Sequence, residues 1–310
     1  MRIIRYIDAL DGTVRLAAVT DAEQAFPLRP PDFIALVKEA EADGITPLEA
    51  VRRQITGAEP LPGDWRALDL LTPVDAPEVW AAGVTYERSR KARNEESQGG
   101  AAGEETFYDK VYRAERPEIF LKSTSARTAR PGSPVCIRGD SDWQVPEPEL
   151  GIVLDSRGRI LGYTAGNDMS CRDIEGENPL YLPQAKIWRR SCSFGPAIRL
   201  AETVPDPYGL TIVCRIYRDG QLEVNESAST SQLRRKLDEL ASWLARDNVV
   251  FDGTVLLAGT CIVPPDRFTL KPGDRIEIEI FGIGTLVNPV AAADAAITDQ
   301  PNQRMGGNHR

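Results

Sequence analysis

Two glutamates separated by one residue stand at the start of a predicted strand, in the run Glu147-Pro148-Glu149, which leads into the apolar stretch 150–154. Side chains alternate along a strand, so Glu147 and Glu149 point to the same face, about 7 Å apart. Two carboxylates at this spacing repel each other unless a positive group lies between them. A hard divalent cation such as Mg²⁺, Mn²⁺ or Ca²⁺ meets that need. A pair of solvated glutamates is the alternative.

A third carboxylate, Asp168, ends the run Gly166-Asn167-Asp168, which follows a predicted strand at 160–164. The turn-forming residues 155–158 predict a hairpin between 150–154 and 160–164. That hairpin would return Asp168 towards the two glutamates. Asn and Asp are common in turns without any function, but three converging carboxylates favour a shared metal ion.

Lysine is the other chemical group that the sequence singles out. Lys186 lies in an apolar, proline-containing stretch rather than in a charge run. If it is buried, it is either held by a counter-charge or has a lowered pKa that suits proton transfer; an ordinary surface lysine is the alternative.

The only histidine is His309, which excludes a histidine-based triad and an HExxH zinc site. Carboxylates, lysine and hydroxyl groups must therefore carry any chemistry.

The composition limits the partners. The chain has 310 residues, 42% of them hydrophobic, and a net charge of −9. Such an acidic protein is not expected to bind nucleic acid or an anionic membrane. No apolar run reaches the ~18 residues of a membrane span. Five scattered cysteines without a CxxC pair indicate neither a disulfide framework nor a zinc knot. With no signal-peptide pattern at the start, we expect a cytoplasmic protein.

The elements that must position these residues predict a β-rich α+β protein. Residues 1–70 form a small N-terminal α+β domain, with a strand at 13–19 and helices at 32–42 and from Thr46 onward. A proline-rich linker at 59–77 leads to a catalytic domain at 78–290, and 291–310 form a polar tail. Within the catalytic domain, a charged helix at 86–97 and a glycine run at 98–103 predict either a mobile lid or a solvated surface excursion.

With these residues in view, the segment 78–290 resembles the fumarylacetoacetate hydrolase superfamily. The resemblance rests on the order of GVTY at 83–86, FLK at 120–122, EPEL at 147–150, GYTAGNDMSCRD at 162–173, QAK at 184–186, GT at 259–260, PGD at 272–274 and GIGTLVNPV at 282–290. It implies a mixed β-roll, commonly a homodimer or higher homo-oligomer. It also implies a Mg²⁺ or Mn²⁺ ion held by Glu147, Glu149 and Asp168, with Lys186 nearby. Thr260 matches a position that contacts the carboxylate of the small-molecule 2-oxo acid substrate.

One departure from the family pattern bears on the reaction. Hydrolytic members use a histidine on the short helix after the Gly-x-x-Tyr element to activate water, and Ser89 stands in that register here. Carbon–carbon hydrolysis is therefore disfavoured. The stretches 116–122 and 173–184 are similar to the branch of 2-keto-3-deoxy sugar-acid dehydratases, which implies a lyase of sugar-acid catabolism.

The expected reaction removes water from a 2-keto-3-deoxy sugar acid through a metal-stabilised enolate. Glu118, just before a predicted buried strand, is the candidate base for the C3 proton, although an ordinary strand-edge glutamate is the alternative. Lys186 would stabilise the enolate or shuttle the proton. Weaker candidates for substrate contacts are Arg88, Ser89, Ser123 and Thr124. Two rival functions stay open: hydrolysis of an acylpyruvate or 2,4-diketo-3-deoxy sugar acid, and a silent sugar-acid binding protein.

Overall fold

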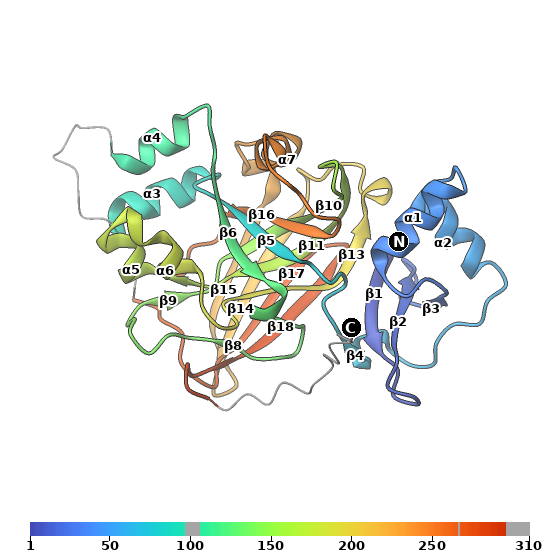
Figure 1. Cartoon of the computed structure of the whole chain (residues 1–310). Helices are drawn as coiled ribbons and strands as arrows, with labels where there is room; N and C mark the ends of the chain where they lie inside the picture. Colours follow the sequence, from blue (N-terminus) through green and yellow to red (C-terminus); the bar gives the residue numbers. More distant parts are fainter. Residues whose placement is uncertain (97–105, 266, 296–310) are drawn as a thin grey trace, which may run out of the picture.

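The computed structural model describes residues 1–96, 106–265 and 267–295. Its strands form a large eleven-stranded sheet, a five-stranded sheet and a two-stranded ribbon, with most of the helices at the two ends of the molecule and α7 (Leu237–Ala245) over its middle (Figure 1). The predicted α+β class with a β-rich core is confirmed. The glycine run at 98–103 and His309 lie outside the described residues.

The large sheet follows the order β3-β2-β1-β13-β11-β10-β16-β5-β6, with β4 beside β1 and β7 beside β13. Its strands are β1 (Arg2–Ile7), β2 (Val14–Val19), β3 (Ala25–Leu28), β4 (Asp69–Leu70), β5 (Glu78–Gly83), β6 (Glu118–Thr124), β7 (Thr128–Ala129), β10 (Pro148–Leu154), β11 (Ile160–Asp168), β13 (Cys192–Leu200) and β16 (Thr254–Thr260). The five-stranded sheet comprises β15 (Gln221–Ser229), β14 (Thr211–Arg218), β17 (Arg275–Ile280), β18 (Gly284–Ala291) and β8 (Val135–Cys136). The ribbon pairs β9 (Gln144–Val145) with β12 (Ser170–Cys171).

The helices of the described residues are α1 (Phe33–Ala42), α2 (Pro47–Ile55), α3 (Glu87–Glu96), α4 (Phe107–Arg113), α5 (Arg172–Glu177), α6 (Leu182–Lys186) and α7 (Leu237–Ala245). Helices α3 to α6 gather at the end of the molecule opposite α1 and α2 (Figure 1). Short 3-10 turns lie at Trp65–Ala67, Ser125–Arg127, Pro179–Tyr181, Ala201–Thr203 and Thr230–Gln232. Among the described helices, none combines the length and apolar content of a membrane crossing.

The hydrophobic core lies between the two larger sheets. In the centre of the large sheet, β10 and β16 are buried along their whole length, as expected for strands with apolar residues on both faces. In β17 of the facing sheet, Ile276, Ile278 and Ile280 alternate with charged residues and point inward. The predicted hairpin is confirmed as β10–β11, and β14 and β15 form a second hairpin. The central strands therefore hold the residues at their ends in fixed positions.

The N-terminal strands continue the large sheet. Strand β1 pairs with β13 through Arg2 opposite Arg199 and Ile3 opposite Ile198. One apolar cluster joins Phe33 of α1 to residues of β5, β13 and β16. That residues 1–70 form a domain independent of the rest of the chain stays a prediction. The predicted linker at 59–77 was wrong in part, because Trp65 is only 2% exposed and packs under the first strands.

Phe33 offers a test of this continuity. Because its ring is fully buried in the cluster shared by both regions, Phe33→Ala should lower the free energy of unfolding by about 3–5 kcal/mol. Urea denaturation followed by far-UV circular dichroism should show one transition that moves as a whole. Phe281→Ala is the matched control, since Phe281 is 54% exposed and should cost less than about 0.5 kcal/mol. Two separate transitions, only one of them shifted, would instead indicate an independent N-terminal domain.

Candidate active site

Three carboxylates meet where the central hairpin ends. The residue before β10, Glu147, is locked opposite the last residue of β11, Asp168: Glu147 N–H donates to Asp168 O at 3.2 Å and Asp168 N–H donates to Glu147 O at 3.0 Å. The next pairs along the ladder bring Glu149 opposite Gly166. One oxygen from each of Glu147, Glu149 and Asp168 lies within 4.8 Å of the others. The hairpin register thus assembles the predicted cluster.

A glycine on the neighbouring strand fixes the second glutamate. Gly259 of β16 donates its N–H to Glu149 Oε2 at 2.7 Å. Its φ is +96°, and a Cβ there would lie 2.0 Å from Thr85 Oγ1 and 2.9 Å from Ala82 O. Only glycine adopts this conformation in so tight a space without strain. The GT element at 259–260 therefore orients Glu149 through its main chain.

The electrostatics of the cluster fit a hard divalent cation. All three side chains are at most 3% exposed. Burial, followed by the charges of Asp168 and Glu147, raises the pKa of Glu149 well above its usual range. Buried carboxylates crowded in this way are stabilised by a shared positive charge, and an all-oxygen donor set suits Mg²⁺ or Mn²⁺. These residues fit such an ion.

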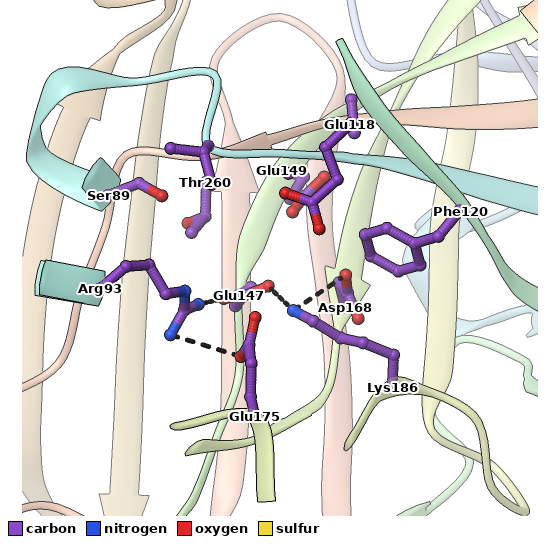
Figure 2. A pocket seen from close by; sticks show the side chains of 13 residues that line it. Ser89, Arg93, Glu118, Phe120, Glu147, Glu149, Asp168, Glu175, Lys186 and Thr260 are labelled. Carbon is purple, nitrogen blue, oxygen red and sulfur yellow. Dashed lines mark hydrogen bonds and ion pairs between the residues drawn. The ribbon is translucent and has the colours of Figure 1, made fainter. Parts of the chain in front are cut away.

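Lys186, at the end of α6, is held by counter-charges. Its Nζ lies 2.6 Å from Glu147 Oε2, 3.5 Å from Asp168 Oδ2 and 2.6 Å from Ser170 Oγ (Figure 2). Burial by itself would lower the pKa of Lys186, but the carboxylates of Asp168 and Glu147 outweigh it and raise that pKa. Of the two predicted possibilities, the structure therefore shows the paired, protonated lysine and not one with a lowered pKa.

Two buried arginines and a further carboxylate escaped the sequence analysis. Arg93 of α3 lies 2.5 Å from Glu147 Oε1 and 3.4 Å from Glu175 Oε2 (Figure 2). Arg172 of α5 lies 2.8 Å from Glu147 Oε1. The element 162–173 of the family resemblance already contained Arg172, but nothing in the sequence indicated that Arg93 would reach Glu147 or that Glu175 would pair with Arg93. The lid interpretation of 86–115 stays a prediction.

Glu118, the candidate base, begins β6 opposite Gly83 of β5. Its carboxylate lies over that glycine: a Cβ at residue 83 would sit 2.3 Å from Glu118 Oε2. Burial, and then the charge of Glu175, raises the pKa of Glu118 to about 7. A carboxyl group with this pKa can both accept and return a proton near neutral pH. Its role as the base stays a prediction.

The structure divides the weaker candidates into two groups. Ser89 and Thr260 line the same cavity as the three carboxylates. Arg88 instead pairs with Glu226 at 3.3 Å on the surface. Ser123 is bonded to Thr128 Oγ1, and Thr124 accepts from Arg127, both at 2.9 Å. On β6 the even-numbered residues up to Lys122 face the site, so Ser123 lies on the other side, and Thr124 lies beyond it at the strand end.

These side chains line one small cavity (Figure 2). Its walls are Ala82, Gly83, Val84, Ser89, Arg93, Glu118, Phe120, Glu147, Glu149, Asp168, Glu175, Lys186 and Thr260. Phe120 supplies the main apolar surface and lies with its ring centre 5.6 Å from Lys186 Nζ. A small, highly charged cavity of this kind suits a short, polar substrate better than an extended apolar one.

Comparison with known proteins agrees with this geometry. A probable 2-keto-3-deoxyxylonate dehydratase of Haloferax volcanii is 52% identical over 218 residues, which span 70% of this chain and 73% of that protein. A 2-dehydro-3-deoxy-D-arabinonate dehydratase of Saccharolobus solfataricus is 48% identical over the same shares of the two chains. A solved 2-keto-3-deoxy-D-arabinonate dehydratase complexed with magnesium and 2,5-dioxopentanoate superposes with a TM-score of 0.80, at 36% identity, over 94% of this chain and 99% of that one.

The family model described as fumarylacetoacetate (FAA) hydrolase C-terminal matches residues 79–291. That range contains both sheets of the core apart from the N-terminal strands, and every residue of the carboxylate cluster. The chain therefore belongs to the fumarylacetoacetate hydrolase family.

Proposed function

We propose that this chain is a Mg²⁺-dependent dehydratase that removes water from a 2-keto-3-deoxy sugar acid. The observation that carries the proposal is that three buried carboxylates, Glu118 and Lys186 all line one small cavity. The two relatives that are about half identical to this chain are named as dehydratases of such acids, and the magnesium complex of a structural neighbour supports the choice of cofactor.

In this proposal Glu147, Glu149 and Asp168 hold Mg²⁺, with Mn²⁺ as a substitute. When bound, the cation supplies Lewis acidity at the 2-oxo and carboxylate oxygens of the substrate, which makes the C3 protons more acidic. Thr260, whose Oγ1 is 3.0 Å from the carbonyl of Pro148, lies at the edge of the cluster and would contact the substrate carboxylate. The substrate is thereby oriented with its reacting carbons towards β6.

In this mechanism Glu118 transfers the proton, and Lys186 stabilises the negative charge that develops on the substrate. Glu118 carboxylate takes a proton from C3, and negative charge develops on the 2-oxygen. The Lys186 ammonium, kept protonated by its carboxylate neighbours, stabilises that charge. The protonated Glu118 then returns the proton to the C4 hydroxyl, which leaves as water. Phe120 beside Lys186 excludes bulk water from this part of the cavity.

Dehydration does not require a water-activating histidine, because water is the leaving group and not the nucleophile. Ser89 occupies the cavity wall where hydrolytic relatives are expected to place that histidine, and its side chain is only 5% exposed. A serine hydroxyl does not act as a base at neutral pH. It would donate to or accept from a substrate hydroxyl and would not activate water.

Product analysis tests the proposal. The chain is incubated with a panel of 2-keto-3-deoxy pentonates and hexonates, with Mg²⁺ or with EDTA, and the products are identified by mass spectrometry. We expect a metal-dependent product lighter than its substrate by one water, with the carbon skeleton intact. Two carbon fragments would contradict dehydration and indicate hydrolytic or aldol-type cleavage, and binding without turnover would indicate a silent binding protein.

The assembly and the location of the protein also remain proposals. Family resemblance supports a homodimer or higher homo-oligomer, and the absence of a disulfide pattern among the five cysteines supports a cytoplasmic location. All five cysteine side chains are buried and unpaired. Size-exclusion chromatography with light scattering tests the first proposal, for which we expect at least twice the mass of one chain.

A further inference from the structure

One peptide group beside the carboxylate cluster is hydrogen-bonded at both ends to side chains. The Gly259 N–H donates to Glu149 Oε2 at 2.7 Å. The Ala258 carbonyl, which belongs to the same peptide, accepts from Thr85 Oγ1 at 2.6 Å. A trans peptide is planar and directs its N–H and C=O to opposite sides. A continuous chain of hydrogen bonds therefore runs from the Thr85 hydroxyl through this peptide to the Glu149 carboxylate.

A β-bulge in β16 makes this peptide available to side chains. On β10, Glu149 and Gly151 are two residues apart, but their partners Thr260 and Leu257 on β16 are three residues apart. An extra residue of this kind interrupts the regular ladder of main-chain hydrogen bonds. Buried N–H and C=O groups are costly to leave unpaired, so the peptide at 258–259 bonds to side chains on both of its sides.

Thr85 is itself held in place by other segments. Its main-chain carbonyl accepts from the Arg234 N–H at 3.0 Å, and the next residue, Tyr86, forms a β-bridge with Leu233. The preceding residue, Val84, has a φ of +52°, which is a genuine outlier for a β-branched side chain. Such a conformation persists only where the surrounding structure imposes it. Thr85 therefore supports the peptide from a fixed position.

The missing side chain of Gly259 gives the Thr85 hydroxyl its place. A Cβ at residue 259 would lie 2.0 Å from Thr85 Oγ1. Thr85 is 1% exposed, so bulk water does not compete for the Ala258 carbonyl, and in a buried chain of hydrogen bonds each bond strengthens the next. Loss of the hydroxyl would leave that carbonyl without its donor and would let the peptide turn its N–H away from Glu149.

We infer that Thr85 is a positioning residue that orients the metal ligand Glu149 through the peptide between Ala258 and Gly259, and thereby sets the affinity for Mg²⁺. The inference rests on the metal site of the proposed function and adds to it a residue outside the cavity. Thr85 is not among the residues that line the cavity, so its hydroxyl acts on the ion only through Glu149.

Isothermal titration of the metal-stripped, full-length chain with Mg²⁺ measures this effect. Thr85→Ala should weaken Mg²⁺ binding by about 10- to 100-fold, the usual cost of losing a group that orients a metal ligand. Thr85→Ser keeps the hydroxyl and should bind Mg²⁺ nearly as tightly as the wild type. Thr254→Ala is the matched control, because Thr254 lies on the same strand as Gly259, is 0% exposed, and has a hydroxyl with no hydrogen-bond partner among the described residues. Its Mg²⁺ affinity should equal that of the wild type.

Equal Mg²⁺ affinity in Thr85→Ala and in the wild type would overturn the role of Thr85 and leave the metal site intact. An equal loss in Thr85→Ser would mean that the hydroxyl is not the group that matters. An equal loss in Thr254→Ala would mean that any buried truncation has this effect, and either result overturns the inference. A wild-type chain that binds no Mg²⁺ would overturn the metal site itself, and with it both proposals.

Thermal denaturation in EDTA shows whether each variant is folded. If Thr85→Ala does not fold, a crystal structure of the wild-type chain with Mg²⁺ decides. Both hydrogen bonds of the 258–259 peptide should be present while Glu149 binds the ion. A Glu149 carboxylate that binds Mg²⁺ only after turning away from the Gly259 N–H would refute the inference.

Discussion

Glu149→Gln is expected to remove Mg²⁺ binding and, with it, all measurable dehydration. Glu149 is 2% exposed and provides one of only three carboxylates in the cluster. Loss of a group that merely orients a ligand costs about 10- to 100-fold in metal affinity, so loss of a charged ligand should exceed the upper end of that range. If the amide oxygen of the new Gln accepts from the Gly259 N–H, its N–H₂ group points into the cluster, where it cannot bind a cation.

Titration calorimetry with Mg²⁺ and an assay of the 2-oxo product measure the two losses separately. Glu175→Gln is the matched control, because Glu175 lines the same cavity but does not belong to the carboxylate cluster. It should keep Mg²⁺ affinity within about tenfold. If Glu149→Gln bound Mg²⁺ as tightly as the wild type, Glu149 would not be a ligand, and the cluster would have to be reassigned.

Glu118→Gln should lower kcat by about 10²–10⁴-fold, the usual contribution of a general acid–base group, with little change in Mg²⁺ affinity. Gln cannot accept the C3 proton, but it has nearly the same shape and leaves the cavity wall in place. Gly83→Ala should also lower kcat, because its methyl group would occupy the space of Glu118 Oε2. Glu223→Gln, at an exposed position on β15, is the control for expression and handling, and its kcat should equal that of the wild type.

The pH dependence adds a second signature of Glu118. A base acts in its ionised form, so kcat/KM should rise with pH through the pKa of Glu118 and then level off. Burial and Glu175 raise that pKa to about 7, and a nearby divalent cation would draw it lower. The midpoint in the Mg²⁺-loaded enzyme is therefore expected at or below about 7. The rising limb should vanish in Glu118→Gln, and a limb that persisted there would belong to another group.

The sequence predicted the metal cluster because strand geometry is local. Alternation placed Glu147 and Glu149 on one face, and a single hairpin brought Asp168 back to them. The fold class and the helices of the first 60 residues follow in the same way from the periodicity of apolar residues and from turn-forming residues. The resemblance to the family supplied the reaction, which local patterns could not.

The rest of the site depends on contacts between distant segments. Arg93 of α3 pairs with Glu175 of α5, and Lys122 of β6 contacts Asp168 of β11. These contacts form only because helices α3, α5 and α6 pack at one end of the sheet. No periodicity in the sequence predicts such contacts between distant segments. Ser123 and Thr124 were selected for their hydroxyl groups, but the alternation that directs Lys122 into the site directs Ser123 away. The linker prediction at 59–77 failed for a similar reason, since Trp65 finds its apolar partners in β1 and β2.

The cavity is built from parts of unequal rigidity, and this bears on how such a protein can diversify. The three carboxylates sit at the end of the central hairpin of the large sheet, whose strands are buried around them, so substitutions there would disturb the core. Ser89 comes from α3, which follows β5 and lies with α4 to α6 at one end of the molecule. Selection can therefore exchange Ser89 and try new substrates or new chemistry at a smaller cost to folding, while the ion-binding half stays unchanged.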